Sequence, residues 1–331
     1  MYPNYRHITL TGLLLLLLIQ SVHIFTALNK SRRIDPDVLV QMERQNVLRN
    51  VCQTAPNTEE KPNHNYYLTD IRRKLVYAWI PKVMSSSMLY AMTMTTPEFY
   101  RTYPNLGTSD SNVSHFYNTE RHLPRDGSET HGIRTQKFGL FNLSTLQTEV
   151  KHQIINESFT FLIVRDPFTR LVSTFNNIYS FGTAEVRTFW SDIYERIQKY
   201  AYPHSNDWRE KTIFFQDFLE YIAQPTVQHD KHWRSYEELV QPCLNRFDYI
   251  VKLETSEKDV PVIMGKISKS NASLLKKINT NKSENNNRYV NCLYKTVRPA
   301  VINRIIEMYR KDFLMFGYDM NRFSNMTAVY C

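Results

Sequence analysis

Glycine is scarce in this chain, because only 8 of its 331 residues are glycine against an average usage of about 7%. This scarcity argues against Gly-rich dinucleotide-binding folds, small barrels and repeats built on glycine turns. The G-x-x-x-x-G-K-S/T pattern of P-loop nucleotide-binding proteins is also absent, which disfavours a P-loop kinase. Histidine, cysteine and aspartate do not occur together at metal-ligand spacing, so the sequence predicts no metal site.

Acidic residues are absent from the first 33 positions, and the net charge of +9 is unevenly distributed. Arg6, Lys30, Arg32 and Arg33 carry +4 of it, which leaves +5 for the rest of the chain. Nucleic-acid-binding proteins show a denser basic face, so we expect no nucleic-acid partner. A modest basic surplus suits binding of small anions or of an acidic polymer.

An uncharged apolar run extends from Ile8 to Leu28 and includes six consecutive leucines, Leu13 to Leu18. About 20 such residues span a bilayer as a helix. A cleaved signal peptide is the alternative, but with a cut after Ala27 the bulky Phe25 occupies a position that requires a small residue. We therefore predict an uncleaved signal-anchor helix over residues 8–28, preceded by a cytoplasmic tail of residues 1–7.

Seven N-x-S/T sequons lie after this run. Any one of them is expected by chance, but seven together with an N-terminal anchor favour a lumenal body and a single-pass type II orientation. Basic residues are denser after the anchor than before it, and the positive-inside rule would therefore place the segment after the anchor in the cytoplasm. We prefer the type II orientation because of the sequons. The sequons begin at Asn29, Asn112, Asn142, Asn156, Asn271, Asn281 and Asn325.

The four cysteines form an even set that can make two disulfides in an oxidising lumen. They are Cys52, Cys243, Cys292 and Cys331. Three pairings are possible, and free buried thiols are the alternative. Residues 29–65 are polar and contain prolines, which indicates a stem with one short helix over Asp37–Arg49. The lumenal globular domain is expected to extend over residues 66–331.

Two short apolar runs, Leu75–Ile80 and Phe159–Val164, are typical of buried strands. Each is followed by a polar loop and a helix-compatible stretch, Ser86–Met94 and Phe168–Tyr179 respectively. Strand, tight loop and helix form the repeating unit of an α/β sheet, whose ligands bind at the carboxyl ends of the strands. We predict one α/β domain with a parallel sheet flanked by helices. Further helices are expected at Ala184–Tyr200, Ile213–Ala223 and Arg298–Phe313.

The loop after the first strand combines three hydroxyls with a lysine at the start of a helix. Free N–H groups and the helix dipole favour a bound anion at such a position. The alternative is a surface loop in which a serine caps the helix and the lysine is solvated. The loop contains Pro81, Lys82, Val83, Met84, Ser85, Ser86 and Ser87.

The loop after the second strand begins with Arg165 and leads to Ser173 eight residues later. A guanidinium grips a phosphate through two parallel hydrogen bonds, and a serine hydroxyl can complete that site. Asp166 is expected to cap the following helix. Arg170 is either part of the site or an exposed helix residue.

Together the two loops resemble the nucleotide-binding signature of the sulfotransferases, most of all the Golgi carbohydrate sulfotransferases that include the chondroitin and dermatan 4-O-, HNK-1 and GalNAc 4-O-sulfotransferases. Their first loop is P-K-V-A-C-T-N-W, where residues 81–88 here read P-K-V-M-S-S-S-M. Their second, V-R-(D/E)-P-F-x-R-L-x-S, is matched at every fixed position from Val164 to Ser173. The resemblance continues through His232–Glu254 and Tyr309–Tyr318 and covers roughly residues 70–320 in the same order.

Two departures mark the chain as a divergent member. Val240 replaces the first cysteine of the family's C-x-P-C sequence, so no disulfide pairing is carried over. Residues 84–88 replace A-C-T-N-W, which leaves Lys82 intact but alters the loop around it. A catalytically inactive, glycan-binding membrane protein is therefore kept as an alternative.

The resemblance implies the sulfotransferase fold and a reaction in which a sugar hydroxyl attacks the sulfur of 3'-phosphoadenosine 5'-phosphosulfate (PAPS) and expels 3',5'-bisphosphoadenosine. It implies that Lys82 neutralises charge on the bridging oxygen and that Ser85–Ser87 hold the 5'-phosphate. It assigns the 3'-phosphate to Arg165 and Ser173. The implied acceptor is the 4-O position of GalNAc in chondroitin-type chains, and the implied compartment is the Golgi.

The acceptor hydroxyl needs a base, for which histidine is suited near neutral pH. His131, between the two loops, and His232, in the matched H-W pair, are candidates. Glu254 is a third candidate, although it is equally explained as a partner of Lys252. Trp233 and other aromatic residues are candidates for stacking on sugar rings, with core packing as the commoner use.

Overall fold

The computed structural model describes residues 35–54, 62–102, 135–182, 189–227, 229–268 and 287–323. The predicted tail, the predicted anchor at 8–28 and His131 lie outside these ranges. The chain divides into two compact units, residues 1–44 and 45–331. Helix α2 (Pro36–Thr54) contains the boundary, and the other elements described belong to the second unit. Among the described helices none is both long and apolar enough to cross a bilayer.

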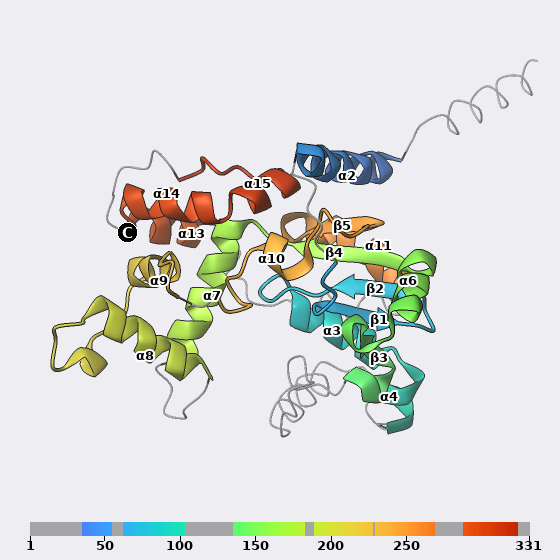
Figure 1. The fold of residues 1–331 in the computed structure, drawn as a ribbon, viewed down its shortest axis with the longest axis horizontal. Helices are drawn as coiled ribbons and strands as arrows, with labels where there is room; N and C mark the ends of the chain where they lie inside the picture. Colours follow the sequence, from blue (N-terminus) through green and yellow to red (C-terminus); the bar gives the residue numbers. More distant parts are fainter. Residues whose placement is uncertain are drawn as a thin grey trace, which may run out of the picture. The chain divides into compact units, whose positions relative to one another are not determined.

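A five-stranded sheet organises the second unit (Figure 1), and its strand order is β3-β1-β2-β4-β5. Its strands are β1 (Tyr67–Asp70), β2 (Leu75–Ala78), β3 (Leu140–Asn142), β4 (Phe159–Val164) and β5 (Tyr249–Lys252). The two predicted strands are confirmed as β2 and β4, which pair in parallel with Leu75 opposite Phe159. β5 extends the parallel part beyond β4.

The prediction of a parallel sheet is wrong for the other half. β1 pairs antiparallel with both β2 and β3, so the sheet is mixed. Only four residues, 71–74, join β1 to β2, and Lys74 adopts a left-handed φ of 52° in that turn. A parallel connection needs a crossover of about a dozen residues or more, so a turn this short dictates an antiparallel pair.

Helices occupy most of the remaining described sequence. The predicted helices after β2, after β4 and at 213–223 are confirmed as α3, α7 and α9, and α8 contains the described part of the helix predicted at 184–200. The helix predicted over 298–313 is instead two helices, because Tyr309 (φ −110°, ψ 14°) leaves the helical conformation. The α-helices are α2 (Pro36–Thr54), α3 (Ser85–Met94), α4 (Pro97–Thr102), α6 (Thr148–Glu157), α7 (Pro167–Gly182), α8 (Phe189–Ala201), α9 (Phe215–Ile222), α10 (Tyr236–Val240), α11 (Ser256–Ile267), α13 (Asn287–Lys295), α14 (Pro299–Met308) and α15 (Arg310–Phe316).

Two apolar clusters form the interior. One surrounds the strands with α3 and α11, and the other joins α7, α8, α9, α13 and α14. β4 ends in the first cluster and α7 begins in the second, where the Phe168 ring lies 5.1 Å from the Tyr294 ring and 4.8 Å from the Phe313 ring. The short connection between Val164 and Pro167 is therefore anchored at one end in each apolar cluster.

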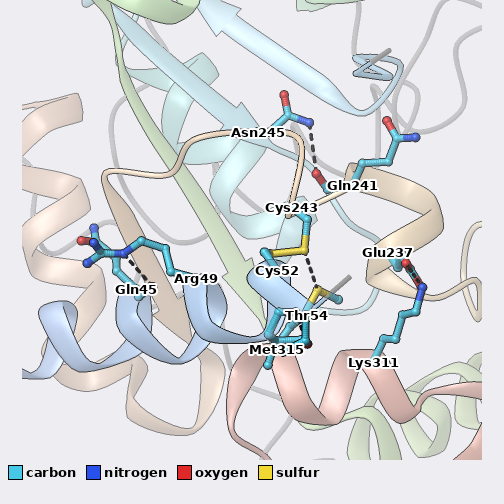
Figure 2. Close-up of a disulfide and its surroundings, with 11 residues drawn as sticks. Gln45, Arg49, Cys52, Thr54, Glu237, Gln241, Cys243, Asn245, Lys311 and Met315 are labelled. Carbon is cyan, nitrogen blue, oxygen red and sulfur yellow. Dashed lines mark hydrogen bonds and ion pairs between the residues drawn. A yellow bond between two sulfur atoms is a disulfide. The ribbon is translucent and has the colours of Figure 1, made fainter. Parts of the chain in front are cut away.

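A disulfide joins the end of α2 to the segment after α10 (Figure 2). It pairs Cys52 with Cys243, 191 residues apart, and the Cys243 sulfur lies 4.0 Å from the sulfur of Met315. Cys292 is also disulfide-bonded, and no described cysteine is free. Gln45, one of the α2 residues in the second unit, donates from Nε2 to the carbonyls of Phe247 and Asp248. This compact unit thus starts within the segment 29–65 that was expected to form the stem.

Candidate functional site

The loop between β2 and α3 contains two non-glycine residues in the left-handed conformation. Lys82 has φ 71° and Met84 has φ 73°. Such a conformation costs roughly 1–3 kcal/mol for each residue and persists only where surrounding contacts hold it, most often at functional sites. Alternation of this kind also builds concave nests of N–H groups that bind anions.

The start of α3 adds donors to this loop. Met84 is the N-cap residue and makes no side-chain cap, so the alternative in which a serine caps the helix is wrong. Ser85, Ser86 and Ser87 instead form the first turn, and Ser85 and Ser87 are buried. First-turn N–H groups have no acceptor within the helix and carry its positive dipole. The loop therefore fits a phosphate or sulfate group.

The second loop meets the first. Arg165 is buried at the end of β4, and its Nη1 donates to the carbonyl of Lys82 at 3.3 Å, across 83 positions of sequence. Its Nε donates to the Thr169 hydroxyl at 3.0 Å. The Tyr236 hydroxyl accepts from the Arg165 N–H at 3.1 Å and donates to its carbonyl at 2.6 Å. Side chain and backbone of Arg165 are thus both fixed beside Lys82.

Asp166 caps the beginning of α7, as expected, because its Oδ1 accepts from the Thr169 N–H at 3.0 Å. Burial raises the pKa of Asp166 to about 6, against the lowering effect of the Thr169 N–H, and the nearby Glu254 carboxylate raises it further. Glu254 itself accepts from the Asp166 N–H at 2.8 Å and from the Tyr318 hydroxyl at 2.9 Å. The geometry gives Glu254 a role in holding the second loop.

Two further residues of α7 face the interior. Ser173 is buried, with 2% of its surface exposed, on the helix that Arg165 precedes. Arg170 is equally buried, and its Nε donates to the carbonyl of Pro81 at 3.2 Å. The alternative of an exposed helix residue is therefore wrong for Arg170, because carbonyl groups of the interior bind its guanidinium.

His232 forms a pair with Asp230. The Asp230 carboxylate bonds the His232 Nδ1 and accepts the His232 backbone N–H at 2.9 Å, and the ring lies 4.6 Å from that of Trp190. Burial lowers the pKa of His232, the Asp230 carboxylate opposes this, and the charges of Lys231 and Lys82 lower it further. The ring is thus neutral at pH 7 with Nδ1–H directed at Asp230, which leaves Nε2 as the proton acceptor.

Asp230 is itself ionised. Burial acts to raise its pKa. The hydrogen bonds from the His232 ring and backbone, the charge that His232 carries at the low pH where a carboxyl titrates, and the charge of Lys231 outweigh burial and hold the pKa below the usual range. Sequence reasoning missed Asp230, although a carboxylate two positions before a histidine was a usable signal. Trp233 and Tyr236 are buried at 3% and 0% exposure, so core packing is their role. In the described part of the chain, no three metal-ligating side chains gather in one place.

Comparison with known proteins gives a consistent picture. A family model described as the sulfotransferase family matches residues 65–319, well over half of the chain. Carbohydrate sulfotransferase 10 of Xenopus laevis is 26% identical over 298 residues, which cover 85% of this chain and 77% of that protein. Carbohydrate sulfotransferase 12 of Mus musculus is 22% identical over 308 residues, which cover 84% and 68%. No solved structure matches significantly.

The match to the family model extends from just before β1 to just after α15, and it includes both loops that meet at Lys82. The chain therefore belongs to the sulfotransferase family, as a divergent member of its carbohydrate sulfotransferases.

Proposed function

We propose that this sulfotransferase moves a sulfuryl group from PAPS to a glycan hydroxyl, at the 4-O position of GalNAc in chondroitin-type chains. The observation that carries the proposal is the contact of Arg165 with the Lys82 loop. A donor with phosphates at its 3' and 5' positions needs two separate anion sites, and the two loops supply them side by side. The relatives named carbohydrate sulfotransferases support a glycan acceptor, and the motif resemblance supports the GalNAc position.

The residues present fit this donor. The left-handed loop at Lys82 and the first turn of α3 suit the 5'-phosphosulfate, because this short segment combines free N–H groups, three serines and a lysine. Arg165 and Ser173 suit the 3'-phosphate, since a buried guanidinium binds phosphate strongly. When bound, PAPS supplies the activated sulfuryl group.

The chain's own groups complete the chemistry. Lys82 places a positive charge where negative charge develops on the donor side. His232, neutral and oriented by Asp230, accepts the proton of the acceptor hydroxyl at Nε2. Positioning and charge stabilisation then provide most of the rate acceleration, as in phosphoryl transfer.

The same proposal includes a Golgi location. Residues 1–7 would form the tail, 8–28 the anchor, 29–65 the stem and 66–331 the lumenal domain, with the Cys52–Cys243 disulfide attaching the later part of the stem to that domain. The Cys52–Cys243 disulfide and the sequons support a body in an oxidising lumen.

The direct test of function is transfer. Purified protein is incubated with radiolabelled PAPS and a panel of desulfated glycans, and the sulfated disaccharides are identified. We expect label on the 4-O position of GalNAc in chondroitin. Label on another glycan would correct the acceptor only, whereas nucleotide binding without any transfer would support the inactive, glycan-binding alternative.

The Lys82→Ala variant tests the donor-side charge. We expect kcat to fall by about 10²- to 10³-fold, as when a transition-state donor is removed, with affinity for 3'-phosphoadenosine 5'-phosphate within about threefold. Lys199→Ala, which changes an exposed lysine of α8, is the matched control. Unchanged turnover in Lys82→Ala would disprove this role.

The Arg165→Lys variant tests the 3'-phosphate site through a comparison of two ligands. Affinity for 3'-phosphoadenosine 5'-phosphate should fall by about 10- to 100-fold, since bonds between charged groups contribute about 1.5–3 kcal/mol. Affinity for adenosine 5'-phosphosulfate, which lacks the 3'-phosphate, should change far less. Equal losses for both ligands, measured by calorimetry, would show that Arg165 does not read the 3'-phosphate.

The pH dependence of kcat/KM tests His232. Burial lowers the His232 pKa, so the neutral ring persists as pH falls. We therefore expect kcat/KM to decrease on the acid side (the acid limb of the profile) only below a pH of about 6.5. Asp230→Asn removes the carboxylate that raises this pKa, so the limb should move to lower pH and the plateau should fall more than about tenfold. The exposed Asp207→Asn is the control. An unmoved limb in Asp230→Asn would exclude His232 as the base and favour His131.

A further inference from the structure

Arg170 bonds two segments that lie on either side of the site. Besides Pro81, its guanidinium donates from Nη2 to the carbonyl of Lys231 at 3.1 Å and from Nη1 to the carbonyl of Arg234 at 2.7 Å. Pro81 begins the Lys82 loop, and the other two carbonyls flank His232. One side chain of α7 therefore contacts both the donor-side loop and the segment that carries the proposed base.

The guanidinium also packs against an aromatic ring. Its Cζ lies 4.9 Å from the centroid of the Tyr236 ring, and the Tyr236 hydroxyl bonds the backbone of Arg165. One turn later on α7, the Thr174 hydroxyl lies 3.0 Å from the carbonyl of His232. Carbonyls on both sides of His232 and its own carbonyl are thus attached to the helix that follows the Arg165 loop.

A buried positive charge needs compensation, and carbonyl dipoles supply part of it. Asp312, which is fully buried, accepts the backbone N–H groups of Tyr236 at 2.8 Å and Glu237 at 3.2 Å. Burial raises the Asp312 pKa to about 7, and the charge of Arg170 acts to lower it. The positive charge of Arg170 therefore favours the ionised form of Asp312, which holds the start of the helix that carries Tyr236.

We propose that Arg170 is a positioning residue, which sets the distance between the Lys82 loop and His232. This inference rests on the proposed function, in which Lys82 acts on the donor and His232 on the acceptor. The left-handed Lys82 needs an external contact to hold it, and the bond from Arg170 to the preceding carbonyl is such a contact. The guanidinium offers five donors in one rigid plane, whereas the lysine ammonium on a flexible stem cannot serve three carbonyls in this geometry.

The test compares Arg170→Lys, which keeps the charge, with Arg196→Lys, a matched change at an exposed arginine of α8. Full-length protein is examined for nucleotide-binding stoichiometry, for kcat and KM, and for amide hydrogen exchange. We expect Arg170→Lys to lower kcat by about 10²-fold, the effect of misplacing reacting groups by about 1 Å, with KM for the donor changed much less. The binding stoichiometry should stay near that of Arg196→Lys.

Hydrogen exchange should quicken in residues 79–94 and 229–241 of Arg170→Lys and remain slow in β4. Thr174→Val provides a second, milder variant, which removes the bond to the His232 carbonyl together with a bond to the Arg170 carbonyl within α7 and leaves the Arg170 guanidinium in place. It should quicken exchange in 229–241 but not in 79–94, with a loss in kcat of about three- to tenfold, a small part of the effect of full misplacement.

Either of two results for kcat would overturn the inference. In one, kcat of Arg170→Lys stays within about twofold of Arg196→Lys. In the other, the loss of kcat equals the loss of binding-competent protein and exchange quickens in β4 as well, which would indicate general destabilisation. If the wild-type protein transfers sulfuryl to no glycan, the proposed function fails on its own, and unchanged exchange in the two segments would still reject the role of Arg170.

Discussion

The hydrogen bond from the Arg165 guanidinium to the Lys82 carbonyl is the constraint on which the rest of this site depends. It joins the ends of two parallel neighbours, β2 and β4, whose carboxyl ends meet at one edge of the sheet. This contact, together with the bond from Arg170 to the Pro81 carbonyl, places the cationic end of β4 beside the N–H-rich loop that follows β2. Arg165 is buried, so its charge is shielded from water, and a guanidinium in such a position binds phosphate strongly.

Helix α7 links the Arg165 loop to the segment around His232, the proposed acceptor side. It begins where the strand cluster ends, anchors Phe168 in the helical cluster, and presents Arg170 and Thr174 to the segment around His232. These contacts start from the buried strands β2 and β4, which pair in parallel in the middle of the mixed sheet. The disulfide between Cys52 and Cys243 attaches the second half of α2 to the same unit, just after α10, the helix that begins with Tyr236.

Local pattern predicted the central part of the fold, because continuous apolar runs bounded by proline identify β2 and β4 without tertiary information. It did not predict β1, whose Thr69 and Asp70 are polar yet buried, nor the antiparallel edge, which a four-residue turn decides. The meeting of the loops followed from strand direction. The burial of Arg170 could not be predicted, since a charge on a helix is usually solvated and its three carbonyl partners lie 61 to 89 positions away. The disulfide pairing likewise required the tertiary structure.

A crystal structure of the protein with 3'-phosphoadenosine 5'-phosphate tests the central claim most directly. The account predicts the 5'-phosphate within hydrogen-bond distance of the N–H groups of Ser85–Ser87 and the 3'-phosphate bonded by Arg165 and Ser173. A nucleotide bound elsewhere, or bound with Lys82 and Arg165 turned away from its phosphates, would contradict it.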